Sequence, residues 1–389
     1  MTDAPLLPPD ANLDRLRRWP DVEAANLFAV DASDRLILDE ASVAVAAAAP
    51  GTVVVINDHY GALAIGAAAN LGARGVRVFQ DALVGEAALA ANARGVTTEL
   101  QSLPLGERLL SGATVVLLQV PRSLAELDEI AGEIARWADP SVVVFAGGRI
   151  KHLSLTMNTV LTKHFGRLDV SLARQKSRVL IAREPLTRES EYPVREFNQE
   201  LGFWVCAHGA VFAGAKLDLG TRLLVSVLDG ALADAVTAID LGSGTGILAA
   251  SLARARPGIS VIATDQSAAA VASSLATMTA NDLGDRVAVV RDDGLKNQPD
   301  SSVDLIVLNP PFHVGATVHT GLAERMFREA ARVLRPGGEL WTVYNSHLAY
   351  RSTLQSLIGS TREVVRNNRF TVTASRRRAP ASRGELDAS

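Results

Sequence analysis

The sequence predicts an α/β protein built from two tandem domains, each with a mainly parallel sheet covered by helices on both faces. Two observations carry this prediction. Strand-like apolar runs alternate with Ala-rich helical runs along the chain, and the same order of parts occurs twice. With 389 residues, the chain is also long enough for each domain to bury its own core.

Composition excludes several classes of protein. Hydrophobic residues make up 48% of the chain, yet no apolar run approaches the length of a membrane span. The only cysteine, Cys206, excludes an internal disulfide, and the N-terminus lacks the segments of a secretory signal. We therefore expect a soluble, cytoplasmic monomer with no membrane partner. Because the net charge is −3, nucleic-acid binding would depend on a local basic surface.

In the first half, the apolar periods predict helices and strands in regular alternation. A helix follows Asp31 or Ser33, either of which suits an N-cap position. We expect strands at 52–57, 75–79, 113–119 and 141–146, and helices at 61–72, 82–94, 123–137 and 153–165. Two short apolar runs, 168–172 and 178–181, are close enough to form antiparallel edge strands.

The second half repeats this order of parts. Residues 61–64 match 246–249 at an offset of 185, and 119–121 match 309–311 at an offset of 190. The glycine pair at 147–148 matches 337–338 at the same offset of 190. The matched positions favour a duplication over the alternative, which is that two unrelated α/β domains alternate alike.

A polar stretch separates the two halves. Residues 183–199 contain two prolines and show neither apolar period, so we place a linker at 186–200 between domains at 1–185 and 201–389. Beyond it, 202–212 predicts a hairpin, and 217–224 opens a helix that is placed to lie over a bound cofactor.

A glycine-rich turn follows the apolar strand at 238–241. Asp240 is followed by Gly242, Gly244 and Gly246, which permit positive φ and let a ligand approach the backbone at a helix N-terminus. The dinucleotide fingerprint would place its third glycine at Ile247, so this turn departs from that fingerprint. The alternative is a merely structural turn from strand to helix.

This acid-x-G-x-G-x-G pattern resembles the first motif of class I, Rossmann-like methyltransferases that use S-adenosylmethionine. The resemblance implies that S-adenosylmethionine is the cofactor and that Asp240 and the three glycines bind it. In the first half, Asn57, Asp58 and His59 stand where the second has Gly242, Ser243 and Gly244, and their side chains fill the space for a ligand. We therefore expect the N-terminal domain to be degenerate, with His59 an ordinary loop or core residue.

Two further acids follow the next strands. Asp265 ends the strand at 261–265, at the distance from the glycine turn typical of a ribose-binding acid; its alternative role is to cap the helix that begins near 267. Asp293 follows the strand at 287–290 and precedes Gly294, where a carboxylate suits the adenine amino group; an ordinary Asp-Gly turn is the alternative.

The strand at 303–308 ends in Asn309-Pro310-Pro311-Phe312-His313, the most specific signal in the chain. The prolines fix a rigid turn and leave the Asn309 side chain and the Pro310 carbonyl as acceptors for an exocyclic amine. Phe312 is suited to stack on a flat base. We predict Asn309, Pro310 and Phe312 to be catalytic, with Asn309 also beside the cofactor. His313 either helps to take up the released proton or is a surface residue. No metal site is expected.

Together these motifs resemble the bacterial ribosomal RNA guanine-N2 methyltransferases. Nearly the whole chain resembles the two-domain type that acts on the large-subunit (23S) RNA; the matching stretches are 56–63, 115–122, 211–212, 217–222 and 367–370. The resemblance implies S-adenosylmethionine-dependent methylation by the C-terminal domain and RNA recognition by the N-terminal one. Ser243 stands where the family often has cysteine; because the backbone makes the contact, we expect no loss of function.

Alternatives remain at this point. They are a 16S guanine-N2 enzyme, an adenine-N6 or protein glutamine-N5 methyltransferase, and a catalytically silent RNA-binding assembly factor. As RNA contacts we predict the following basic residues, although charge runs are also typical of a solvated face: Lys163, Lys176, Arg178, Arg369, Arg376 and Arg377. The last three belong to a tail at 362–383 with seven arginines and one acid, Glu363.

Overall fold

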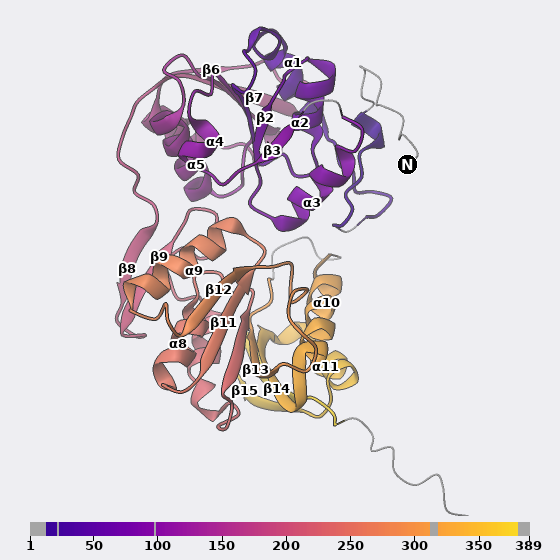
Figure 1. The fold of residues 1–389 in the computed structure, drawn as a ribbon, viewed down its shortest axis with the longest axis vertical. Helices are drawn as coiled ribbons and strands as arrows, with labels where there is room; N and C mark the ends of the chain where they lie inside the picture. Colours follow the sequence, from indigo (N-terminus) through magenta and orange to yellow (C-terminus); the bar gives the residue numbers. More distant parts are fainter. Residues whose placement is uncertain (1–12, 22, 97–98, 312–317, 380–389) are drawn as a thin grey trace, which may run out of the picture. The chain divides into compact units, whose positions relative to one another are not determined.

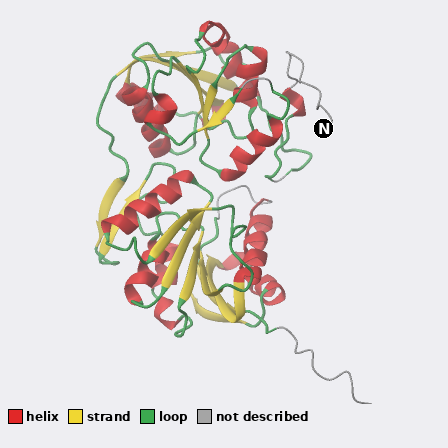
Figure 2. Ribbon diagram, viewed as in Figure 1, coloured by secondary structure: helices red, strands yellow, loops and turns green. Residues whose placement is uncertain are grey.

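A computed structural model describes residues 13–21, 23–96, 99–311 and 318–379, without the side chains of 318–320. The chain forms two compact units. The N-terminal unit comprises Met1–Pro193, His208–Val211 and Ser267–Ala269, and the C-terminal unit comprises Val194–Ala207, Phe212–Gln266 and Ala270–Ser389. Each unit contains one sheet of seven strands with helices on both faces (Figures 1 and 2).

The sheet of the N-terminal unit has the strand order β3-β2-β1-β4-β5-β7-β6. Parallel pairing joins the first five strands, whereas β7 runs antiparallel to both β5 and β6. The strands are β1 (Val53–Ile56), β2 (Val76–Phe79), β3 (Leu100–Ser102), β4 (Val115–Gln119), β5 (Val143–Arg149), β6 (Phe165–Val170) and β7 (Ser177–Pro185).

The helices of this unit are α1 (Ala32–Ala47), α2 (Ala62–Ile65), α3 (Leu83–Asn92), α4 (Glu107–Leu110), α5 (Leu124–Trp137) and α6 (Leu155–His164). Residues of β1 alternate between two cores: Val55 packs in the cluster that contains Ile37 of α1, and Val54 in the cluster that contains Leu127 of α5. Burial on both faces explains why the central strands read as continuous apolar runs.

The C-terminal unit repeats this topology with the order β12-β11-β10-β13-β14-β16-β15. Its strands are β10 (Thr237–Leu241), β11 (Ser260–Asp265), β12 (Val287–Arg291), β13 (Val303–Leu308), β14 (Leu334–Asn345), β15 (Thr361–Arg366) and β16 (Phe370–Arg376). Its helices are α7 (Leu219–Val225), α8 (Ile247–Ala255), α9 (Ala268–Ala280), α10 (Val318–Val333) and α11 (Arg351–Leu357). The two matching strand orders confirm the predicted tandem α/β fold.

The predicted hairpin at 202–212 is wrong. β9 (Phe203–Ala207) pairs antiparallel with β8 (Val194–Asn198), which lies inside the stretch predicted as a linker. Arg195 lies over the Trp204 ring, 4.3 Å from its centroid, and Phe197 meets the same ring edge-on at 5.3 Å. Because β8 is largely solvent-exposed, its sequence shows no alternation of apolar and polar residues.

Other departures from the predicted elements are smaller. The short β3 and α4 were not expected, and most of the predicted basic tail belongs to β15 and β16 of the sheet. Among the described residues, no helix is both long and apolar enough to cross a membrane.

Candidate active site

The glycine-rich turn joins β10 to α8 at the carboxyl edge of the C-terminal sheet. Gly242, Gly244 and Gly246 have φ values of 73°, 54° and 76°, in the region that glycine favours. At Gly246 the space is also tight, since an added Cβ would lie 2.8 Å from Met278 Cε and 3.0 Å from Ser274 Oγ. This glycine is therefore required by conformation and by packing against α9.

Hydrogen bonds fix the turn against β11 and α9. The backbone N–H groups of Gly242 and Ser243 donate to the Thr264 carbonyl at 2.8 and 3.0 Å. The Ser274 hydroxyl donates to the Gly244 carbonyl at 3.0 Å and lies 3.1 Å from the Ser243 hydroxyl. The backbone is thus held open at the strand ends without bulky side chains, as a ligand cradle requires.

Asp240 is fully buried on β10. Its Oδ2 accepts the Ala249 backbone N–H of α8 at 2.9 Å, and its Oδ1 has no hydrogen-bond partner among the described residues. Burial raises the pKa of the Asp240 carboxyl to about 7, against the lowering effect of the Ala249 N–H. The side chain therefore ties the strand to the helix, and a direct contact with the cofactor stays a prediction.

Asp265 and Asp293 stand at the carboxyl ends of the next two strands. Asp265 Oδ2 accepts the Gly244 N–H at 3.0 Å, which places this carboxylate directly beside the glycine turn. Asp293 is buried and pairs with Arg325 at 2.7 Å and with Lys296. Burial alone would raise the pKa of Asp293, but these two cations bring it below its usual value. Ribose and adenine contacts by these acids stay predictions.

Asn309 directly follows β13, and β13 pairs with β10 through Leu308 and Leu241. The Asn309 Nδ2 group donates to Thr221 Oγ1 at 2.9 Å and to Asp218 Oδ2 at 3.4 Å. Its Oδ1 is buried and has no hydrogen-bond partner among the described residues. An acceptor oxygen is therefore available at the sheet edge that carries the glycine turn.

Two neighbours complete the predicted motif. Pro310 is buried next to Asn309. Phe312 and His313 lie outside the described residues. The catalytic roles of Asn309, Pro310 and Phe312 accordingly stay predictions.

This edge of the sheet fits S-adenosylmethionine. The turn presents three glycines in left-handed conformation, and Asp265 lies against it. Gly242 in particular leaves room, because an added Cβ would meet its nearest atom, Met326 Cε, only at 3.6 Å. A nucleoside with a charged side chain needs this combination of open backbone and a carboxylate. In the described ranges, no group of three or more His, Cys, Asp or Glu side chains is placed to hold a metal ion.

The matching turn of the N-terminal unit keeps the left-handed backbone conformation but only the last of the three glycines. Asn57, His59 and Gly61 have φ values of 59°, 58° and 101°. Asp58 is buried and accepts the N–H groups of Leu63 and Ala64 at 2.7 and 2.8 Å. Side chains thus occupy the positions that are bare in the C-terminal turn, and His59 is exposed on the loop.

The six basic residues predicted to touch RNA have different environments. Lys163 pairs with Asp128 and Glu191, both at 3.3 Å. Arg376 donates to the Gly337 carbonyl at 3.0 Å, and Arg377 donates to the Ser301 hydroxyl at 2.8 Å and to the Leu334 carbonyl. These three side chains are therefore engaged within the fold.

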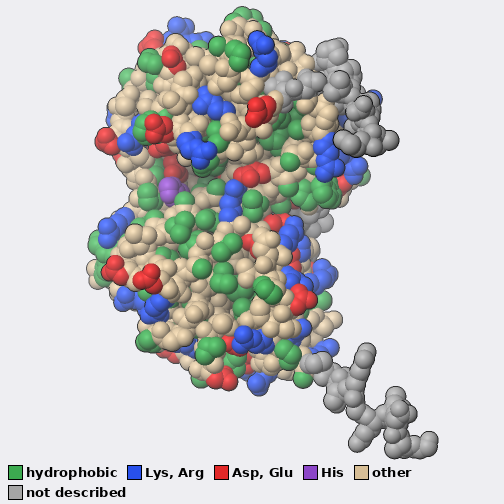
Figure 3. All heavy atoms as spheres, viewed as in Figure 1, with side chains coloured by type: hydrophobic (Ala, Val, Ile, Leu, Met, Phe, Trp, Pro, Cys, Tyr) green, Lys and Arg blue, Asp and Glu red, His purple; other side chains and the backbone are tan. Residues whose placement is uncertain are grey.

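Lys176, Arg178 and Arg369 form no side-chain hydrogen bond or ion pair within the described part of the chain. Lys176 and Arg178 flank the start of β7, and Arg369 precedes β16. On the face shown in Figure 3, Lys and Arg side chains are interspersed with Asp and Glu.

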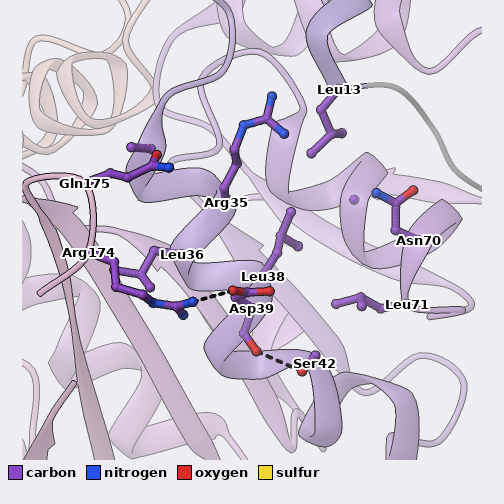
Figure 4. Close-up of a pocket in the computed structure, with 12 residues that line it drawn as sticks. Leu13, Arg35, Leu36, Leu38, Asp39, Ser42, Asn70, Leu71, Arg174 and Gln175 are labelled. Atoms are coloured by element: carbon purple, nitrogen blue, oxygen red, sulfur yellow. Dashed lines mark hydrogen bonds and ion pairs between the residues drawn. The ribbon is translucent and has the colours of Figure 1, made fainter. Parts of the chain in front are cut away.

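The N-terminal unit also contains a cavity of about 650 Å³ beside α1. Leu36 and Leu38 of α1 and Leu71 supply apolar lining, and Arg174 reaches across to Asp39 at 2.7 Å (Figure 4). No residue of the turn at 57–61 lines it, so it is separate from the position that matches the glycine turn. We assign no ligand to it.

Two family models cover almost the whole chain. The model described as methyltransferase small domain matches residues 202–374, and the RLMG N-terminal domain matches residues 6–186. Curated relatives named ribosomal RNA large subunit methyltransferase G include one from Pseudomonas aeruginosa (strain UCBPP-PA14), 35% identical over 94% of this chain and 97% of its own. Another, from Streptomyces coelicolor, is 33% identical over 92% of this chain and 96% of its own.

The fold also resembles a solved structure. A T. thermophilus 16S rRNA N2 methyltransferase in complex with AdoMet and guanosine has a TM-score of 0.71, with 21% identity over 90% of this chain and 92% of that one. Fold, glycine turn and family models together define an S-adenosylmethionine-dependent methyltransferase. More narrowly, the chain belongs to the ribosomal RNA large subunit methyltransferase G family.

Proposed function

We propose that this enzyme methylates the exocyclic N2 amine of a guanine in 23S ribosomal RNA. One observation carries the proposal: the buried Asn309 Oδ1 lacks a partner among the described residues, at the strand end beside the glycine turn. The family name of the curated relatives supports a large-subunit RNA substrate. We expect the enzyme to act on this RNA in the cytoplasm, as a monomer.

The chemistry of an exocyclic amine explains why such an acceptor is needed. The lone pair of guanine N2 is delocalised into the ring, so the amine is a weak nucleophile. When bound, S-adenosylmethionine supplies the methyl group from its sulfonium. Asn309 Oδ1 and the Pro310 carbonyl accept the two N–H bonds of the amine and orient it. They also stabilise positive charge on the nitrogen as the new bond forms, and the proton then leaves to solvent.

A comparison of ribosomal RNA from a deletion strain and its parent tests the target. Mass mapping should find one methylguanine missing from 23S RNA, restored by the wild-type gene and not by Asn309→Ala. With the purified enzyme, Asn309→Ala should lower single-turnover methylation by about two or more orders of magnitude, while cofactor affinity stays nearly constant. A missing methyl group on 16S RNA, on an adenine or on a protein glutamine would contradict the proposal.

We further propose that the N-terminal unit holds the RNA through a basic surface at the carboxyl edge of its sheet, here called the edge surface. Its residues are Arg122, Arg149, Lys151, Lys176 and Arg178. The pairing of β5 with β7 places Arg149 opposite Ser177 and Arg178 opposite Gly148, and the Ile150 N–H donates to the Lys176 carbonyl at 2.9 Å.

Electrostatics support this cluster. Burial, and then the positive charges of Arg122, Lys151 and Arg149, lower the pKa of His152, so these cations share one neighbourhood. In the described part of the chain, no carboxylate pairs with the five side chains. Unpaired cations at one edge are suited to phosphate contacts.

RNA binding measured at several salt concentrations tests the edge surface. A Lys151→Ala, Lys176→Ala, Arg178→Ala triple variant should bind RNA more weakly and show a shallower salt dependence, by about one unit for each lost phosphate contact. Arg74→Ala, an exposed change before β2 at the opposite edge, serves as the control. Unchanged affinity and slope in the triple variant would refute this role.

A further inference from the structure

The N-terminus of α7 contacts the Asn309 amide. Asp218 caps this helix, because its Oδ1 accepts the N–H groups of Gly220 and Thr221 at 2.9 and 3.2 Å. Its second oxygen, Oδ2, accepts Asn309 Nδ2 at 3.4 Å, and Thr221 Oγ1 accepts the same group at 2.9 Å. Residues 218–221 therefore cap α7 and also bind the Asn309 side-chain amide.

These contacts decide which end of the amide remains available. An asparagine side chain presents a donor NH₂ on one side and an acceptor oxygen on the other, and the two are related by a simple flip. A carboxylate only accepts, so Asp218 favours the orientation in which the NH₂ faces α7. In that orientation Asn309 Oδ1 is turned away from α7, and its hydrogen-bonding capacity is unused among the described residues.

The duplicated N-terminal unit shows the same arrangement with one difference. Asp31 caps α1 as Asp218 caps α7, and Gln119 at the end of β4 corresponds to Asn309 after β13. Gln119 Nε2 donates to Asp34 Oδ1, the counterpart of the Thr221 contact. Here, however, a hydroxyl stands beside the amide: Ser33 Oγ donates to Asp31 Oδ1 at 2.5 Å, accepts Gln119 Nε2 at 3.2 Å and lies 3.3 Å from Gln119 Oε1.

The position that corresponds to Ser33 in the C-terminal unit is Gly220. Each follows its capping aspartate by two residues. A Cβ added at Gly220 would lie 3.6 Å from Asn309 Nδ2 and 3.2 Å from Asp218 Oδ1, so a side chain there would stand next to the amide. The glycine leaves this position without the hydroxyl that stands beside the amide in the N-terminal unit.

We propose that Asp218, Gly220 and Thr221 are positioning residues that orient the Asn309 amide and keep its oxygen free for the amine of the substrate. This inference rests on the proposed role of Asn309 as the acceptor. In this proposal the first residues of α7 do more than cap the helix. They also fix which way the Asn309 amide faces.

Gly220→Ser tests the proposal most directly, with Gly220→Ala as the matched control. Both variants add a Cβ, and only the serine adds a hydroxyl that can bind the Asn309 amide and compete with its contacts to Asp218 and Thr221. We expect Gly220→Ser to lower single-turnover kcat about tenfold or more below Gly220→Ala, with the RNA KM and cofactor Kd of the two alike. Equal kcat values for the two variants would overturn the role of Gly220.

Thr221 supplies a second, independent comparison. Thr221→Val keeps the shape and removes the acceptor, whereas Thr221→Ser keeps the hydroxyl. The valine variant should lose kcat by about tenfold and the serine variant should retain it, because a merely structural role would not distinguish them in this way. Asn309→Ala is measured in parallel. If Asn309→Ala lowers kcat while Thr221→Val and Gly220→Ser do not, the positioning role is wrong and the proposed function of the site stands. If Asn309→Ala leaves kcat unchanged, the proposed function of the site is itself wrong.

Discussion

Asn57 and Gly242 occupy matching positions of the two duplicated turns, and both have left-handed backbone conformation, with φ of 59° and 73°. The two units thus share the shape of the turn, although the N-terminal one carries asparagine where the C-terminal one carries glycine. Asn is among the few residues other than glycine that adopt this region readily. We therefore expect side chains that fill space, and not a changed backbone path, to keep the cofactor out of the N-terminal unit.

The first prediction is that each chain binds one S-adenosylmethionine, in the C-terminal unit. Calorimetry on the wild-type protein should give a stoichiometry of one. Gly244→Asp should abolish binding, because it adds a side chain and a negative charge to a turn with φ of 54°. His59→Ala, at the matching position of the N-terminal turn, should leave binding unchanged. A stoichiometry of two would contradict the assignment.

The second prediction concerns Asp265. Its carboxylate accepts the Gly244 N–H and is placed for the ribose, so Asp265→Ala should weaken cofactor binding by about tenfold or more. The matched control is Asp300→Ala, since Asp300 is an exposed acid that precedes β13 at the opposite edge of the same sheet. Equal cofactor affinities for the two variants, measured by calorimetry, would exclude the ribose role.

The third prediction is a pH dependence of stability caused by Asp240. Burial raises its pKa in the folded protein to about 7, so the folded state holds this proton more tightly than the unfolded chain does. The associated stabilisation is complete below the ordinary aspartate pKa of about 3.8 and is lost as the pH rises through about 7. The total change in the free energy of unfolding between these two pH values is on the order of a few kcal/mol.

Asp240→Asn isolates this effect because the amide keeps an oxygen for the Ala249 N–H but does not titrate. Wild type should lose stability relative to the variant between pH 5 and pH 8, in denaturant unfolding measured without cofactor. Asp300→Asn, which changes an exposed acid, should run parallel to wild type. A wild-type curve parallel to that of Asp240→Asn would contradict the pKa shift.

The fourth prediction separates structural arginines from RNA contacts. Arg377 donates to the Ser301 hydroxyl and to the carbonyls of Arg332 and Leu334 at the amino edge of the C-terminal sheet. Arg377→Ala should therefore reduce the free energy of unfolding by about 1–3 kcal/mol and leave RNA affinity unchanged. Lys176→Ala should instead leave the free energy of unfolding unchanged and reduce RNA affinity. Thermal unfolding and RNA titration of both variants check this, and a selective loss of RNA affinity in Arg377→Ala would contradict it.

The sequence by itself determined the duplicated α/β fold and the location of the glycine turn. Apolar runs such as residues 53–56 and 305–308 are buried on both faces of the sheet, and this double burial explains why the sequence alone predicts them as strands. The turn at Gly242, Gly244 and Gly246 could be predicted for a different reason: left-handed backbone conformations locally restrict the residue type, mostly to glycine.

Tertiary structure decided what the local pattern does not contain. Strand β8 is stabilised by its partner β9 and not by an apolar period, so its sequence looks like a linker. Arg377 looks like any basic residue of a tail until the carbonyls around it are placed. The free oxygen of Asn309 depends on Asp218 and Thr221, about ninety positions earlier in the chain, because a hydrogen bond is fixed by proximity in space and leaves no mark in sequence spacing.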